Sequence, residues 1–444
     1  MKVLFITTFG QSIPHEHIFT RNVWLKMCQY PEVNLLTIYE GANNESKSEW
    51  LTYDKAEHWY QLTIPSHILK SHSSTVDFIE QSLRQISPDI IHSNMIEGFE
   101  IEAAKRLNIP AVVTMHIGGL ICPRGGGNGF LKWDDSLCNG NIGTECRKCC
   151  CHELPLPYIA RAIDYTMPQK IINWLKNISR HRKIFYLSPL LSINGTIAER
   201  LRTIEILKYA TVITANSRLS EMLSSLGIPT AVIPHGIRHF NRIQYPTIDS
   251  DSVIKFYFLG RIQYSKGLHI LLKAFKGIPQ NLYELHVFGD AYQPRREQRY
   301  KKKILHLAKD INVSFHGFVE NSDLNSLLKD MHVMIHPAIY HEVYGINISE
   351  ALSLGHPVLA TQCGGPEMQI REGINGWLVP PNSPYALRNA INKIIDQRDR
   401  LSTMSANCSC PNTLEHYVEE LMSLYRKITK ADEKNTGNSQ RTIS

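Results

Sequence analysis

Short apolar runs of strand length alternate with helical patterns along almost the whole of this chain of 444 residues. This alternation is typical of parallel β-sheets covered by helices, because each parallel strand reaches the next through a helical crossover. The pattern occurs in two series, separated by a polar linker at 241–252. We therefore predict an α/β protein with two doubly wound domains. The predicted strands lie at 3–8, 33–38, 89–92, 111–116, 211–215 and 231–234, and then at 254–260, 283–289, 313–318, 333–336, 357–361 and 376–379.

The composition is that of a globular protein with enough material for two cores, since 43% of the residues are hydrophobic and 20% are charged. We expect the first domain at 1–240 and the second at 241–411. An amphipathic helix is predicted at 412–430 and is expected to pack back on the first domain. Residues 431–444 are polar and are predicted to be disordered.

The N-terminal segment, the lack of long apolar stretches and the net charge indicate where the protein is expected to act and which partners are not expected. The first ten residues carry one positive charge and a short apolar run without a small-residue cleavage site, which predicts a buried strand rather than a signal peptide. No uncharged apolar stretch approaches the roughly 20 residues that a membrane-spanning helix needs. The net charge of +7 is modest, and we expect no nucleic-acid partner. A cytoplasmic location is expected.

Two segments of the second domain carry the parts of an anion-binding site. In the first, a predicted strand ends at Gly260, then come Arg261 and Lys266, and a helix opens at Gly267. Guanidinium groups bind phosphate oxygens in pairs, an ammonium adds a point charge, and a helix N-terminus adds backbone amides. By itself this loop is weak evidence, because many surface loops would match it.

The second segment places two carboxylates around a predicted helix start at Gly345. Glu342 lies just before that start, and Glu350 lies one to two turns inside the helix. Carboxylates accept hydrogen bonds from sugar and ribose hydroxyls, while the amides of Gly345 and Ile346 would face phosphates. The segment therefore suits a nucleotide carrying a sugar.

These motifs resemble the donor-binding half of the family 4 glycosyltransferases. The resemblance rests on the Glu342-x7-Glu350 pair, on the stretch 351–360, on Gly-Gly-Pro-Glu at 364–367 and on Glu-Gly-Ile-Asn-Gly-Trp-Leu-Val at 372–379, together with the loop that holds Arg261 and Lys266. It implies a retaining enzyme of the GT-B fold, in which two Rossmann-like domains face a central cleft. A nucleoside-diphosphate sugar would be the donor.

The same resemblance assigns roles to individual residues. It implies that Arg261 and Lys266 neutralise the donor diphosphate, that Glu342 contacts donor sugar hydroxyls and that Glu350 holds the ribose. The stretch 316–320 would line the nucleotide base, with main-chain atoms near Val319 reading it. Tyr344 stands where the family more often has Phe.

The first domain offers fewer motifs. Gly10 follows the first predicted strand, where a tight turn could bring the backbone close to the donor phosphate. His116 ends a predicted strand and resembles the family histidine that reaches the donor sugar near the reacting carbon. Taken alone, such a histidine is more often a core or loop residue than a catalytic one.

No metal is expected to take part in catalysis, because Arg261 and Lys266 would supply the charge that stabilises the leaving diphosphate. No protein nucleophile is assigned, since Glu342 is better explained as a sugar-binding group. The resemblance thus implies four catalytic residues: His116, Arg261, Lys266 and Glu342. The implied donor-binding residues are Gly10, Gly260, Val319, Gly345, Ile346 and Glu350.

Six of the ten cysteines fall between positions 122 and 151. In a cytoplasmic protein such clustering indicates metal before disulfide. Four thiolates, from Cys122, Cys138, Cys146 and Cys149, could bind one structural zinc ion; reduced thiols in a glycine-rich loop are the alternative. A subset of family 4 enzymes resembles this chain in carrying an insert here, at 118–152 in the N-terminal domain, which implies a role near the acceptor entrance.

A basic amphipathic helix predicted at 170–183 leaves membrane association open. Ile171, Trp174, Leu175 and Ile178 share one face, flanked by Lys and Arg. The pattern suits a helix at an anionic lipid surface, which would place the enzyme at the inner membrane face. It equally suits a core-facing helix with a basic outer side.

The leading function is the transfer of a sugar to a glycan or lipid-linked glycan acceptor, as in cell-surface polysaccharide biosynthesis. The alternative is a nucleotide-sugar- or zinc-binding scaffold without turnover. A sugar phosphorylase is disfavoured, because no lysine site for a pyridoxal cofactor is apparent. The sequence leaves open the donor base and sugar, the acceptor, the linkage and the oligomeric state.

Overall fold

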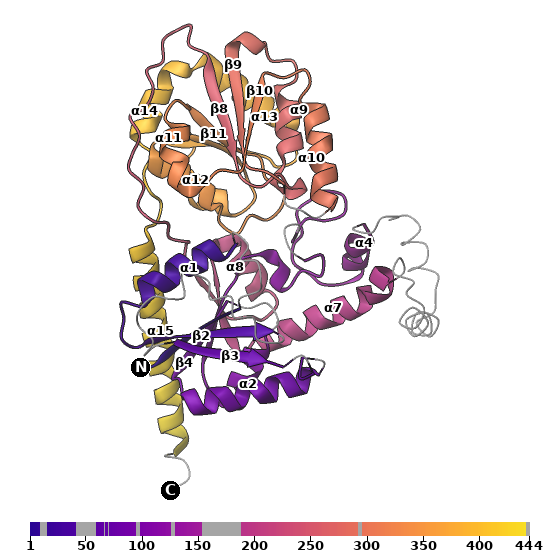
Figure 1. Cartoon of the computed structure of the whole chain (residues 1–444), viewed down its shortest axis with the longest axis vertical. Coiled ribbons are helices and arrows are strands. Elements are labelled where there is room, and N and C mark those ends of the chain that lie inside the picture. Colours follow the sequence, from indigo (N-terminus) through magenta and orange to yellow (C-terminus); the bar gives the residue numbers. More distant parts are fainter. Residues whose placement is uncertain are drawn as a thin grey trace. The chain divides into compact units, whose positions relative to one another are not determined.

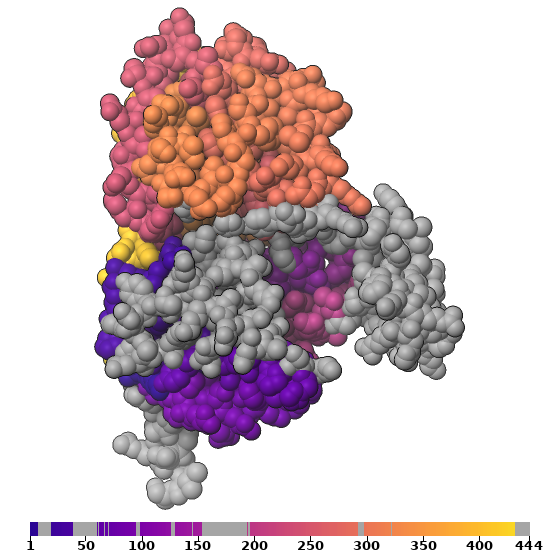
Figure 2. Space-filling view, in the orientation of Figure 1, coloured from indigo at the N-terminus to yellow at the C-terminus, as the bar shows by residue number. Residues whose placement is uncertain are grey.

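The computed structural model describes residues 1–8, 16–40, 59–65, 67–69, 71–94, 98–125, 129–152, 188–291 and 295–440. Gly10 and the helix expected at 170–183 lie outside these ranges. The chain forms two compact units (Figure 1), which Figure 2 shows in space-filling form. Unit 1 comprises Met1–His116, Glu199–Arg238 and Thr413–Ser444, and unit 2 comprises Ile117–Ala198 and His239–Asn412.

Unit 1 is built on a seven-stranded sheet of order β3-β2-β1-β4-β5-β6-β7, in which every pair is parallel. The central strands read as continuous apolar runs because helices cover both faces of such a sheet. The strands are β1 (Val3–Thr8), β2 (Val33–Glu40), β3 (Trp59–Ile64), β4 (Ile90–Ser93), β5 (Ala111–Thr114), β6 (Ala210–Thr214) and β7 (Thr230–Val232). The helices are α1 (Glu16–Met27), α2 (His72–Ile86), α3 (Phe99–Arg106), α8 (Ser217–Ser224) and part of α7 (Ser188–Leu207).

Strand β3 is absent from the sequence-based prediction. It lies at the edge of the sheet and pairs with β2 in the register Leu35↔Trp59. Polar Gln61 and Thr63 interrupt its apolar run. An edge strand is less completely covered than a central one, so its sequence carries a weaker signal.

Unit 2 has a six-stranded parallel sheet of order β10-β9-β8-β11-β12-β13. Its core gathers buried aliphatic and aromatic side chains from the strands and from the helices that cover them. The strands are β8 (Ile254–Leu259), β9 (Tyr283–Phe288), β10 (Val313–Gly317), β11 (Val333–His336), β12 (Val358–Thr361) and β13 (Gly376–Val379). The helices include α9 (Leu268–Phe275), α10 (Arg295–Leu307), α11 (Leu324–Leu328), α12 (Ile346–Leu354), α13 (Pro384–Asp396) and α14 (Leu401–Ala406).

The described residues of the cysteine-rich segment, 118–152, group with unit 2, and not with the N-terminal domain as expected from the sequence. It contains α4 (Thr144–His152) and a short hairpin closed by the bridge between Leu131 and Leu137. Leu131 is buried in the core of unit 2. In the sequence this segment follows β5 of unit 1, but its apolar side chain Leu131 packs in the core of unit 2.

The C-terminal helix α15 (Leu414–Gln440) belongs to unit 1. Its residues Tyr417 and Tyr425 are fully buried, and the hydroxyl of Tyr425 is hydrogen-bonded to Nδ1 of His92. The helix continues to Gln440, whereas disorder is predicted from residue 431 on the basis of the sequence. Polar composition does not by itself end a helix, and Ala431, Glu433 and Lys434 are good helix formers that extend it beyond 430. Within the described part of the chain, no helix has the length and hydropathy needed to cross a membrane.

Candidate functional site

The candidate site of unit 2 lies where the strand order reverses. The chain runs outward through β8, β9 and β10 and then returns to the other side of β8 with β11, β12 and β13. The loops that follow β8 and β11 therefore leave neighbouring strands in opposite directions. Ligands of open α/β sheets bind in the crevice that such a switch creates at the carboxyl ends of the strands.

Glycines allow the loop after β8 to approach its neighbours closely. Gly267 has φ +73°, and a Cβ atom there would stand 1.8 Å from the carbonyl oxygen of Pro337 in the loop after β11. At Gly289 a Cβ atom would stand 2.0 Å from the carbonyl oxygen of Gly260. Both positions need glycine for space and for backbone conformation. Arg261 and Lys266 are carried on the loop that these contacts fix.

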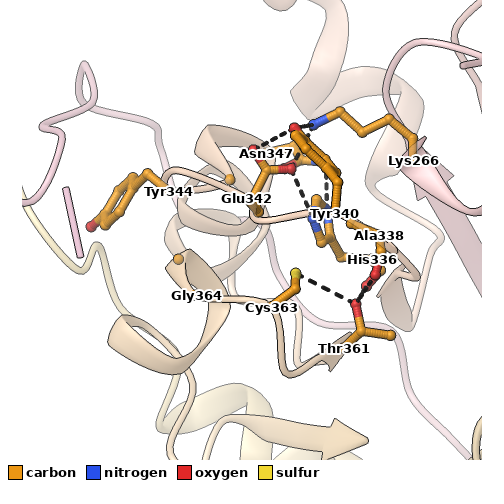
Figure 3. Close-up of polar contacts among 12 residues, drawn as sticks. Lys266, His336, Ala338, Tyr340, Glu342, Tyr344, Asn347, Thr361, Cys363 and Gly364 are labelled. Atoms are coloured by element: carbon orange, nitrogen blue, oxygen red, sulfur yellow. Dashed lines mark hydrogen bonds and ion pairs between the residues drawn. The ribbon is translucent and has the colours of Figure 1, made fainter. Parts of the chain in front are cut away.

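A buried ion pair joins the two loops. Nζ of Lys266 lies 2.6 Å from Oε2 of Glu342, and the hydroxyl of Tyr340 donates to Oε1 of Glu342 at 2.9 Å (Figure 3). Nζ of Lys266 also donates to the hydroxyl of Tyr340 at 2.9 Å. The Glu342 side chain is 8% exposed, so the pair is largely withdrawn from solvent. Two residues that are 76 positions apart in the sequence thus form one polar centre.

His336 completes this centre from the end of β11. Its Nε2 lies 3.2 Å from Oε2 of Glu342, and its Nδ1 lies 3.2 Å from the amide nitrogen of Asn347. The same amide donates to the carbonyl of Leu259 at 2.6 Å, which identifies it as the nitrogen end of the side chain. Nδ1 of His336 therefore accepts, and Nε2 carries the proton that faces Glu342.

Burial and charge set the ionisation of the group. Burial alone would raise the pKa of Glu342, but Lys266 and His336 outweigh it and hold that pKa below its usual range. Burial likewise opposes the charge of Lys266, yet the Glu342 carboxylate and Tyr340 raise its pKa above the usual range. Burial lowers the pKa of His336 despite Glu342. At neutral pH the site therefore holds a lysine cation, a glutamate anion and a neutral histidine.

Helix α12 opens beside this centre. Gly345, with φ +84°, is its N-cap, and the helix begins at Ile346. A helix N-terminus presents free backbone amides and the positive end of the helix dipole, both of which favour an anion. Glu350 lies in the second turn and is 7% exposed. The helix start and the position of Glu350 one to two turns inside the helix agree with the expectation from the sequence.

Gly364 and Gly365 pack closely against the loop that leads into α12. A Cβ atom on Gly365 would stand 2.3 Å from the carbonyl oxygen of Tyr344, so only glycine fits. The ring of Tyr344 is buried and points away from Lys266 and Glu342 (Figure 3). Tyr344 therefore acts in packing, and its aromatic ring does not join the polar centre.

His116 lies at the corresponding edge of the sheet in unit 1, just beyond β5. It is partly exposed, and its Nε2 lies 2.8 Å from the side-chain oxygen of Asn94, which follows β4. The hydroxyl of Thr20 lies 3.4 Å from the same nitrogen. Strands β1 and β4 flank the point where the strand order of this sheet reverses. His116 therefore occupies a typical ligand-binding edge of unit 1.

Of the residues expected from the sequence, Lys266 and Glu342 meet directly. Arg261 lies on the same loop as Lys266, while Val319 is partly exposed and follows β10. His116 belongs to the other unit. Three residues of the polar centre were missed: His336, Tyr340 and Asn347. The only sequence signal for His336 is its place at a strand end. Tyr340 and Asn347 have no such signal.

The four cysteines expected to bind zinc lie near one another. Burial raises the pKa of Cys122 and Cys146, and it raises that of Cys149 to about 11. Smaller upward shifts come from Cys138 at Cys122, and from Cys122 and Cys138 at Cys146. None of the ten cysteines forms a disulfide. In the ranges that the structure covers, no three Cys, His, Asp or Glu side chains are arranged to hold a metal ion as they stand.

Comparison with known proteins places the polar centre in a recognised family region. Residues 247–408 match the family model described as glycosyl transferases group 1. The chain is 27% identical over 201 residues to a lipopolysaccharide 1,2-N-acetylglucosaminetransferase of Salmonella typhimurium, covering 42% of this chain and 52% of that protein. It is 30% identical over 154 residues to the D-rhamnosyltransferase WbpZ of Pseudomonas aeruginosa, covering 34% and 39%. The chain thus spans about half or less of the length of these relatives.

Solved structures resemble the chain over nearly its whole length. HepE of Anabaena, solved in complex with UDP, has a TM-score of 0.62 at 17% identity and covers 96% of this chain and 100% of that one. Sucrose-phosphate synthase of Thermosynechococcus elongatus has a TM-score of 0.64 at 16% identity and covers 97% and 99%. At such identities the likeness concerns the fold alone. The fold is GT-B, with two Rossmann-like parallel-sheet units, and the predicted fold class is confirmed.

Proposed function

We propose that this chain is a retaining glycosyltransferase of family 4, which transfers a sugar from a nucleoside-diphosphate sugar to a glycan or lipid-linked glycan. The observation that carries the proposal is the buried pair of Lys266 and Glu342 at the switch point of unit 2, beside the N-terminus of α12. A site with a fixed cation, free helix amides and a fixed carboxylate suits a diphosphate joined to a polyhydroxylated group.

The names of the matching proteins support this function. The family model for residues 247–408 describes glycosyl transferases, and the two relatives cited above are named as sugar transferases. One of them is named for lipopolysaccharide, and one similar structure holds UDP. We extend to this chain the use of a nucleotide sugar and a part in cell-surface polysaccharide biosynthesis.

The proposed chemistry follows from the charges. When the bond between the anomeric carbon and the diphosphate oxygen breaks, that oxygen keeps the electron pair, and Lys266, Arg261 and the amides of α12 stabilise it. Glu342 binds donor sugar hydroxyls, and Glu350 holds the two ribose hydroxyls. The acceptor hydroxyl oxygen bonds to the anomeric carbon on the face that the diphosphate leaves, and its proton passes to the departing diphosphate oxygen, so that the configuration is retained.

A thermal-shift and hydrolysis screen against UDP-, GDP-, ADP- and TDP-sugars tests the donor site. We expect one nucleotide class to stabilise the protein, and expect Lys266→Ala and Glu350→Ala to abolish the effect. Lys273→Ala, which changes an exposed lysine of α9, is the matched control and should keep the response. No response of the wild-type protein to any nucleotide sugar would refute the proposal.

The non-catalytic alternative makes a different prediction for the same protein. A scaffold would bind the nucleotide sugar. It would not hydrolyse the nucleotide sugar, even slowly, and would not transfer the sugar to any acceptor. The presence of Arg261, Lys266, Glu342 and Glu350 together favours turnover. Binding without any turnover would favour the scaffold.

We further propose that the cysteine-rich segment binds a structural zinc ion. The backbone N–H of Phe130 donates to Sγ of Cys122 at 3.4 Å, and that of Gly140 donates to Sγ of Cys138 at 3.3 Å, bonds that would stabilise thiolate ligands. The four cysteine sulfur atoms would have to move closer together to bind one zinc ion. Elemental analysis of the purified protein should find about one zinc per chain, which the double variant Cys146→Ser, Cys149→Ser should lose; a wild-type protein without metal refutes the idea.

The expected place of action is the cytoplasm, at the inner membrane face. The support is the basic amphipathic pattern at 170–183. Sedimentation with vesicles of phosphatidylglycerol and phosphatidylcholine should carry the protein down, and vesicles of phosphatidylcholine alone should not. Equal recovery in both supernatants would count against membrane association.

A further inference from the structure

The cysteine-rich segment contacts both loops of the proposed donor site. It lies in the sequence between β5 and β6 of unit 1, yet it packs in unit 2 with Leu131 in the core there. The hairpin around Leu131 is held by Arg124, whose Nη1 donates to the carbonyls of Leu131 and Lys132. The segment therefore presents a fixed surface to the rest of unit 2.

The first contact is on the loop that carries Lys266. The hydroxyl of Tyr264, two residues before Lys266, donates to Oδ2 of Asp135 at 2.6 Å. The Tyr264 ring stacks on His269 with ring centres 4.6 Å apart. Asp135 has φ +63°, in the left-handed region that Asp and Asn tolerate better than most residues. The hairpin turn thus aims a carboxylate at the lysine loop.

The second contact is on the loop that carries Glu342. Nε2 of His341, the residue before Glu342, donates to the carbonyl of Cys138 at 2.8 Å. The ring of Phe130 meets the His341 ring edge-on, with centres 6.0 Å apart. His341 is 5% exposed, so this bond is made away from solvent. A buried hydrogen bond of this kind fixes the loop backbone next to the carboxylate.

We infer that Asp135 and the carbonyl of Cys138 are positioning groups for the donor site, which hold the loops of Lys266 and Glu342 in the geometry that binds a nucleotide sugar. The inference rests on the proposed function of those two residues. Without the contacts, each loop must be ordered when the donor binds, and affinity falls by the cost of that ordering. The cysteine-rich segment then acts on the donor, whereas the sequence analysis places its role near the acceptor entrance.

The variants are chosen to spare the fold. Tyr264→Phe removes only the hydroxyl, and Asp135→Gly removes the carboxylate while keeping a residue that accepts positive φ. Asp135→Asn keeps an acceptor oxygen and should restore most of the function. His341→Ala removes the second contact, and His341→Gln offers a replacement N–H. Asp134→Ala is the matched control, because the Asp134 carboxylate bonds Ser136 within its own turn.

Two measurements on the full-length protein separate the possible outcomes. Titration with UDP-, GDP-, ADP- and TDP-glucose gives the dissociation constant, and hydrogen exchange of the unliganded protein reports on backbone amides at 264–268 and 340–346. We expect Tyr264→Phe, Asp135→Gly and His341→Ala to speed exchange in these loops and to weaken binding about fivefold to tenfold. The Tm should stay unchanged in Tyr264→Phe and Asp135→Gly and fall in His341→Ala, which loses a buried side chain. Asp134→Ala should match the wild type.

Exchange and affinity equal to wild type in Tyr264→Phe and Asp135→Gly would overturn the inference. Faster loop exchange with unchanged affinity would also overturn it, because the contacts would then be structural only. If the wild-type protein bound none of the four nucleotide sugars, the proposed function would fail, and loop exchange alone would still decide whether the contacts hold the loops.

Discussion

At the scale of single residues, the charges of Lys266 and Glu342 depend on each other. Glu342 is buried and Lys266 is half-buried, and each keeps its charge because the other lies 2.6 Å away. Removing one partner of such a pair leaves an uncompensated buried charge, whereas removing both can cost little. Glu342→Gln or Lys266→Met alone should each lower the free energy of unfolding of unit 2 by about 3 kcal/mol.

The double variant Glu342→Gln, Lys266→Met should recover part of that loss, which denaturant unfolding of the four proteins can measure. Losses that simply add in the double variant would mean that the two charges do not interact in solution.

A second residue-scale prediction concerns close backbone approach. Gly267 and Gly277 have similar positive φ angles, +73° and +88°, but only Gly267 has an atom in the way of a Cβ. Gly277→Ala should therefore cost only the backbone strain, about 1 kcal/mol. Gly267→Ala should cost clearly more and also weaken nucleotide-sugar binding, because the loops after β8 and β11 must separate. Equal Tm values for the two variants would contradict the close approach.

At the scale of elements, α15 stabilises the sheet of unit 1. The buried hydroxyl of Tyr425 bonds Nδ1 of His92, whose Nε2 lies 2.6 Å from the hydroxyl of Thr114. Tyr425→Phe leaves a buried nitrogen without its partner on α15 and should destabilise unit 1 by about 1–3 kcal/mol. Thermal unfolding checks this, with Tyr385→Phe, at 72% exposure, as the silent control. An unchanged Tm for Tyr425→Phe would mean that water replaces the hydroxyl.

At the scale of the whole molecule, buried neutral histidines should make the protein sensitive to acid. Burial lowers the pKa of His92, His269 and His356 to about 3 and that of His332 to about 4. The unfolded chain, with histidine pKa values near 6.5, binds more protons between these limits, so stability falls as the pH drops from about 6.5 towards 4. Each histidine contributes up to about 1.4 kcal/mol per pH unit.

Melting curves between pH 7.5 and 4.5 measure this dependence. His356→Gln should flatten it, whereas His416→Gln, which changes an exposed side chain, should leave it unaltered. A wild-type Tm that stays constant down to pH 4.5 would contradict the burial of these imidazoles in solution.

The sequence alone is sufficient to predict the two parallel sheets and the loops that carry Arg261, Lys266, Glu342 and Glu350. It could do so because a buried parallel strand needs an apolar run, and because strand ends and helix starts have local signals in glycine and polar residues. The edge strand β3 and the last turns of α15 lack a comparable signal, and both were missed.

Which of these parts meet depends on the fold of the whole unit. Lys266 and Glu342 touch because β8 and β11 are neighbours in the sheet, and strand order is a property of the whole domain. His336 and Tyr340 join them for the same reason. The cysteine-rich segment packs in unit 2 through Leu131 and Asp135, although it lies in the sequence between two strands of unit 1. Such contacts depend on burial between distant segments, which no local pattern of residues records.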